Sequence, residues 1–157
     1  MSASPGKLET AVALLATKLA TVSGAVVIRW PGDSEPEDFG DRDNYPTDTR
    51  VLISIDETGG LEGAMSGEDG RSRGEMARHQ TATVLVRCWA YAIGDPPARS
   101  QAFIESRRDV LNAIEQVYDP GVFGAAGFIG DWVRVTRGPS RAPYAGFAVE
   151  TLVTFHE

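Results

Sequence analysis

The segment at residues 81–118 decides the fold and reads TATVLVRCWAYAIGDPPARSQAFIESRRDVLNAIEQVY. Small or apolar side chains occupy every second position of its first half, at Ala82, Val84, Val86, Cys88 and Ala90. Because successive side chains of a strand point to opposite faces, this alternation predicts a strand over 81–92 with its small face against the core. The opposite face carries Thr81, Thr83, Leu85, Arg87, Trp89 and Tyr91.

A long amphipathic helix is predicted directly after this strand. Gly94 stops the strand, Asp95 is suited to cap a helix N-terminus, and the prolines that follow are tolerated in a first helical turn. The helix should end at Asp119, where Pro120 and Gly121 follow. Its predicted apolar stripe consists of Phe103, Arg107, Val110, Ile114 and Val117, flanked by Ile104, Leu111 and Tyr118. We expect Val110, Leu111 and Ile114 to face the Val84, Val86 and Cys88 side of the sheet.

The remaining elements follow outward from this core. An apolar stripe predicts a first helix from Pro5 to about Val22, and apolar runs predict strands over 25–30, 51–56, 132–136 and 144–155. Glycines at every third position of 121–130 predict a connector, because their spacing does not fit a dinucleotide-binding loop. The sequence therefore predicts one α+β domain over 1–157. It should hold a mainly antiparallel sheet of about five strands packed by two helices, in the order αβββαββ.

Composition limits the class of protein. The chain has 157 residues, of which 42% are hydrophobic and 24% charged, which suits one globular domain. The single Cys88 excludes an internal disulfide and is expected to be a small buried hydrophobe in a reducing, intracellular setting. No apolar run is long enough for a membrane span and no signal peptide is recognisable, so we expect a soluble protein. A net charge of −7 disfavours a dedicated nucleic-acid-binding surface.

The loop expected at 57–80 is long, glycine-rich and nearly free of large apolar residues. Since it joins two strands expected to pair as a hairpin, it should project as a flexible arm. Arg71, Arg73 and Arg78 make the arm locally basic among several acidic residues. A phosphate-binding role is conceivable, but a mixed-charge protein interface or a merely solvated arm is favoured.

No pattern for catalysis, a cofactor or a metal is found. The acidic run at 41–44 begins like a calcium loop, but Tyr45 and Pro46 replace the next ligand and the glycine. His79 and His156 have no evident companions in the sequence, and no nucleophile elbow, phosphate loop or zinc spacing occurs. We therefore expect a protein that is not an enzyme and needs no cofactor.

The order of elements resembles the tail terminator proteins of tailed bacteriophages. The resemblance covers nearly the whole chain and lies in the strand TATVLVRCWAYA, the helix ARSQAFIESRRDVLNAIEQVY and the closing hairpin of DWVRVTRGP with YAGFAVETLVTFHE. It implies a ring, typically of six subunits, that caps the finished tail tube and joins it to the head. The implied partners are other copies of the chain, the tail tube protein and a head-side neck protein, and the implied location is the virion after assembly in the host cytoplasm. The family has no catalytic residues.

Under this reading the candidate interface residues are Arg71, Arg73, Arg78, Arg87, Trp89 and Tyr91. Six copies of a chain with net charge −7 would carry −42 in total, so acidic groups in the bore would let DNA pass without specific binding. Trp89 has an alternative role as the core of a second layer. Alternative functions are another head-to-tail neck component, such as a tail-completion or stopper protein, and a small ligand-binding domain or enzyme.

Overall fold

The computed structural model describes residues 7–32, 46–62, 79–138 and 143–156. Its elements are helix α1 (Lys7–Leu19), strands β1 (Ala25–Gly32), β2 (Val51–Glu62) and β3 (His79–Tyr91), helix α3 (Pro96–Tyr118), the short π-helical turn η4 (Pro120–Gly124), and strands β4 (Phe128–Arg137) and β5 (Tyr144–His156). The predicted α+β class and order of elements are confirmed.

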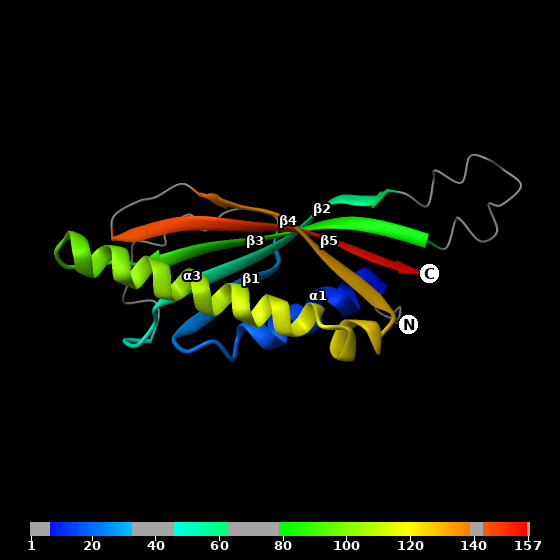
Figure 1. Ribbon diagram of the computed structural model, residues 1–157, viewed down its shortest axis with the longest axis horizontal. Coiled ribbons are helices and arrows are strands. Elements are labelled where there is room, and N and C mark those ends of the chain that lie inside the picture. Colours follow the sequence, from blue (N-terminus) through cyan, green and yellow to red (C-terminus); the bar gives the residue numbers. More distant parts are fainter. Residues whose placement is uncertain (1–6, 33–45, 63–78, 139–142, 157) are drawn as a thin grey trace, which may run out of the picture.

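The strands form a single five-stranded sheet in the order β1-β2-β3-β5-β4. Neighbours pair antiparallel except β1 and β2, which run parallel. The parallel pair was not predicted. Figure 1 shows α1 and α3 on the same side of the twisted sheet, so within the described residues one face of the sheet is covered by helices and the other is not. Strands β1 and β4 are the two edges.

The core lies between the sheet and the two helices, on the small face of β3. Val84, Val86 and Cys88 are fully buried there, together with Val110 of α3 and Leu15 of α1. This confirms the predicted direction of the β3 alternation. Each such aliphatic side chain stabilises the fold by about 1.5–3 kcal/mol when removed from water.

The predicted boundaries of α3 agree with the structure. The Asp95 side chain accepts a hydrogen bond of 2.9 Å from the Ala98 amide, and Pro96 begins the helix. At the other end, the Asp119 side chain accepts a bond of 2.7 Å from the Gly121 amide. Asp95 thus caps the N-terminus of α3, and Asp119, the residue at which α3 ends, caps the first turn of η4.

The predicted stripe of α3 is partly wrong. Ile104 is 45% exposed and Leu111 is only half-buried, whereas Ser106 and Ala113 are buried. The sheet-facing positions of α3 are Phe103, Ser106, Val110, Ala113, Ile114, Val117 and Tyr118. These positions follow steps of three and four. Ile104 and Leu111 lie on the flanks of the stripe, as expected, and Leu111 still packs against the core, whereas the buried Ser106 and Ala113 were not predicted.

All five strands extend beyond their predicted limits at one end or both. β2 continues to Glu62 and β3 begins at His79, so both ends of the expected 57–80 loop belong to the sheet. β4 begins at Phe128, inside the segment predicted to be a connector. Phe128 is buried there because its ring packs beside those of Phe123 and Phe155. The strand was not predicted here because the glycines of this segment are typical of a connector.

Gly130 has a specific role in β4. A Cβ atom at this position would lie 2.5 Å from Cγ of Tyr118. The ring of Tyr118 therefore packs directly on the strand backbone, which only glycine permits.

Candidate interaction surfaces

The candidate residues on β3 lie on the sheet face without helices. Trp89 is only 1% exposed and packs with Leu52 of β2 and Tyr144 of β5. The Tyr91 ring lies 5.5 Å from that of Tyr144. This small apolar cluster is a second layer of packing, so Trp89 is not available in this structure as an exposed anchor.

Arg87 lies on the same face and pairs with an acidic residue. Its Nη2 atom is 3.0 Å from Oδ2 of Asp56 on the neighbouring strand, and the Asp56 side chain is 5% exposed. Because a buried carboxylate is costly without a partner, this pair has a structural role. The other candidate arginines, Arg71, Arg73 and Arg78, lie outside the described residues, as does most of the predicted arm.

The edge strand β4 carries four of the seven exposed large apolar side chains found among the described residues. Exposed fractions are 60% for Ile129, 43% for Trp132, and 41% for both Val133 and Val135. In the part of the chain that the structure describes, β4 is an edge strand and pairs with β5 alone. An exposed apolar edge can accept another strand or a flat protein surface.

Sequence reasoning missed this edge. The sequence predicted a strand over 132–136. Its position at the edge of the sheet depends on the strand order, which was not predicted. A register shift between Trp132 and Arg134 marks a bulge, and Arg134 Nε lies 2.9 Å from Glu150 Oε1 of β5. A bulge and a charge are usual protections of an edge against indiscriminate pairing. The mixture of apolar and charged residues in DWVRVTR was the signal that could have indicated an edge.

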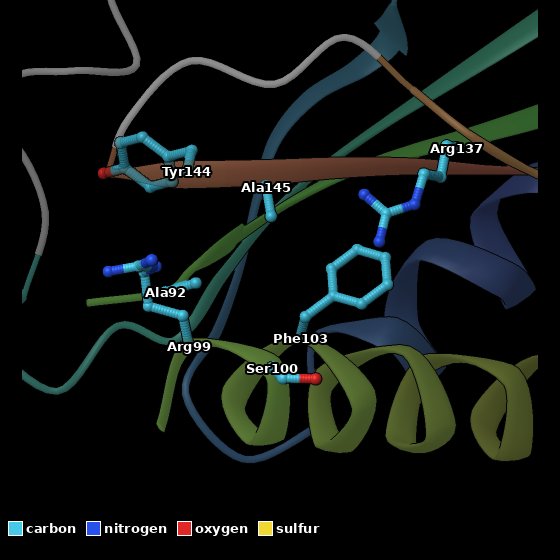
Figure 2. A pocket seen from close by; sticks show the side chains of 7 residues that line it. All are labelled: Ala92, Arg99, Ser100, Phe103, Arg137, Tyr144 and Ala145. Carbon is cyan, nitrogen blue, oxygen red and sulfur yellow. The ribbon is translucent and has the colours of Figure 1, made fainter. Parts of the chain in front are cut away.

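A pocket of about 390 Å³ opens where α3 begins, beside the ends of β3 and β4 and the start of β5. Figure 2 shows the Arg137 side chain directed toward the ring of Phe103, and Arg99 on the opposite side of the pocket. The lining residues are Ala92, Arg99, Ser100, Phe103, Arg137, Tyr144 and Ala145. A second open pocket of about 500 Å³ lies between α1 and the end of α3 and is mostly apolar.

Two arginines lie close to the aromatic ring of Phe103. The guanidinium carbon of Arg137 lies 5.0 Å from the ring centroid, and that of Arg107 lies 5.4 Å from it. Arg99 donates a hydrogen bond of 2.6 Å from Nη1 to the Gly94 carbonyl oxygen. We call the cavity together with Arg99, Arg107 and Arg137 the arginine pocket.

The arginines of the pocket differ from the other described arginines in having no ion pair with a carboxylate among the described residues. Among arginines whose side chains the structure describes, the ones outside the pocket each lie within ion-pair distance of an acid: Arg50, Arg87, Arg108 and Arg134. In the described part of the chain no ion pair is found for Arg99, Arg107 or Arg137. Among the arginines with described side chains, the three without an ion pair are thus the two beside the Phe103 ring, Arg107 and Arg137, and Arg99 in the lining of the same pocket.

Burial raises the pKa of two titratable groups in the core, Cys88 and Tyr118. Burial raises the pKa of the Cys88 thiol well above its usual value, which keeps the sulfur protonated and unreactive. Burial also raises the pKa of Tyr118 to about 12, partly opposed by its hydrogen bond with Thr151, 2.7 Å between the two hydroxyl oxygens. Thr151 in turn donates to the Val84 carbonyl oxygen at 3.2 Å. These groups join α3 to the sheet.

Among the residues that the structure describes, no group of three or more histidine, cysteine or acidic side chains is arranged to hold a metal ion. In the β3–β5 register His79 stands opposite His156, a proximity that the sequence did not reveal. Within the same described residues, no helix combines the length and apolar character needed to cross a membrane.

A comparison with protein-family models finds no match for this chain, and a search of curated proteins finds none either.

Proposed function

We propose that this chain is a structural protein of a tailed bacteriophage that forms a ring, with six subunits as the expected number, on the end of the tail tube. The ring stops polymerisation of the tube and provides the surface to which the head is joined. The proposal comes from the resemblance of the elements to tail terminators, and the β4 edge is the observation that supports it best.

A closed ring needs a heterologous interface, in which one surface of a subunit meets a different surface of the next. The β4 edge offers such a surface, because Ile129, Val133 and Val135 are exposed beside unpaired backbone groups. Monomeric proteins seldom leave such an edge uncovered. A contact with a neighbouring subunit would remove these side chains from water.

The test uses the whole chain and purified tail tubes. Ile129→Lys with Val133→Lys places two charges on the edge, and the expected result is a folded monomer that no longer forms rings or caps tubes. Ile104→Lys is the matched control, because Ile104 is a similarly exposed apolar residue at 45% but lies on α3. Light scattering measures the subunit number, and negative-stain images of tubes report capping.

The outcomes separate the competing functions. A wild-type protein that stays monomeric at high concentration and leaves tube ends free would refute the ring. Binding to the portal side of heads instead of tube ends would indicate a different neck component. Equal loss of rings in the edge variant and in Ile104→Lys would show that the β4 edge is not the specific contact.

A further inference from the structure

The arginine pocket is positively charged in an otherwise acidic protein. Among the described residues, its lining contains the guanidinium groups of Arg99 and Arg137 and no carboxylate, whereas the whole chain has a net charge of −7. Arg107 adds a third cation against the face of Phe103. Like charges gathered without a counter-charge repel one another, so this arrangement favours the entry of an anion.

The donors of the pocket remain available for a ligand. A guanidinium group has five N–H donors in a rigid plane. The described hydrogen bonds use one nitrogen of Arg99, and Arg137 is held by its ring contact with Phe103. Both groups can therefore present paired N–H bonds to a carboxylate in the two-pronged geometry that arginine favours.

Apart from the arginines, the lining combines the apolar residues Ala92, Phe103 and Ala145 with Ser100 and Tyr144, and the apolar part selects among anions. Ala92, Ala145 and Phe103, all labelled in Figure 2, contribute the apolar part of the lining. An organic acid with a short hydrocarbon stem would cover these groups, whereas inorganic phosphate has no apolar part to place on them. Glutamate and aspartate side chains have the required combination of stem and carboxylate.

We propose that the arginine pocket binds a carboxylate carried by an acidic peptide segment of a second copy of this chain. Two observations favour a second copy. The chain is itself acidic, with 22 Asp and Glu against 15 Lys and Arg, so another copy supplies many carboxylates. In addition, Arg137 is both the last residue of β4 and part of the pocket lining, so the pocket is continuous with the exposed edge. The inference rests on the proposed ring.

A first experiment tests the pocket alone. The probe is N-acetyl-glutamate amide, with N-acetyl-glutamine amide as the uncharged control, titrated into isotopically labelled protein and followed by NMR. Shifts are expected at the Ser100 amide and at the side-chain N–H groups of Arg99 and Arg137, with the glutamate probe only. In the double variant Arg99→Gln with Arg137→Gln, binding should weaken at least roughly tenfold, which is the loss expected for a charge-assisted hydrogen bond.

The matched control is Arg108→Gln. Arg108 lies on the same helix, but its side chain is 60% exposed and pairs with Asp109 outside the pocket. This variant should bind the probe like the wild type. Absence of shifts with the glutamate probe, or equal shifts with the glutamine probe, would overturn the site. Stronger binding of inorganic phosphate than of the glutamate probe would overturn the choice of a carboxylate ligand.

A second experiment tests the occupant and separates it from the ring itself. Light scattering measures oligomer mass for the wild type, the double variant and Arg108→Gln at low and high salt. If the occupant is a second copy, the double variant dissociates at least roughly tenfold more readily while Arg108→Gln assembles normally. If the double variant binds no probe but forms wild-type rings, the occupant is not a second copy and the inference fails while the ring stands. If the wild type binds the probe but never assembles, the proposed function and the assigned occupant fail together, and only the carboxylate pocket remains.

Discussion

Replacing Trp89 with alanine removes the largest side chain that is fully buried among the described residues. A tryptophan buries about 150–250 Å² of surface, which at about 25 cal/mol per Å² corresponds to an upper bound near 4–6 kcal/mol. The alanine variant would also leave a cavity between Leu52 and Tyr144. Core changes from tryptophan to alanine cost about 3–5 kcal/mol, so we expect a loss in that range.

The assay is thermal and urea unfolding of wild type and variant, followed by far-ultraviolet circular dichroism. For a domain of about this size, 1 kcal/mol shifts Tm by roughly 2–4 °C, so Trp89→Ala should lower Tm by roughly 6–20 °C. Trp89→Phe is the control and should lose less, because it keeps an aromatic ring in the cluster. A change in Tm below about 2 °C together with weakened rings would refute this reasoning and favour the alternative role of Trp89 as a subunit anchor.

Three further predictions follow from the fold. Val110→Asp places a charge at a fully buried position and should cost several kcal/mol, whereas Leu111→Asp on the half-buried flank should cost clearly less; urea midpoints measure both. Asp95→Ala removes the cap of the Ala98 amide and should cost about 0.5–2 kcal/mol, whereas Asp95→Asn should cost little. Tyr118 has a folded pKa of about 12 and an ordinary value of 10, so its contribution to stability is fully present below pH 10 and is lost as pH rises toward 12. Tyr118→Phe should therefore flatten the alkaline fall in stability between pH 10 and 12, and an unchanged slope would show that another group, such as Cys88, is responsible.

Local signals in the sequence were sufficient for the centre of the fold. The alternation through Val84, Val86 and Cys88 placed the core face of β3 correctly, and Asp95 with Pro96 marked the start of α3. Both signals depend on residues that are close in the chain, namely strand alternation and helix capping. Contacts between distant parts of the chain have little influence on these two local features, so the predictions made from them agree with the structure.

Features that depend on distant contacts were not predictable. The rotation of α3 about its axis, which exposes Ile104 and buries Ser106, is decided by how the helix lies on the sheet. The start of β4 was not predicted because a glycine such as Gly130 is typical of a loop. Its reason for being in a strand, the packing of the Tyr118 ring on its backbone, depends on a contact distant in the sequence. The same applies to the arginine pocket, since Arg99 and Arg137 are far apart in the chain and meet only after β4 and β5 pair.

The positions of the exposed edge and of the arginine pocket bear on how an acidic chain could assemble at all. With a net charge of −7 on each copy, association is opposed by long-range repulsion and needs local contacts of opposite sign. The β4 edge supplies apolar area but its Arg134 is already paired with Glu150, so that residue adds little net attraction. Arg137 ends the same strand without such a partner among the described residues and lines the pocket. A neighbour docked on the edge would therefore find its electrostatic contact at the pocket end of β4, and the assembly should weaken with salt more through Arg137 than through Arg134.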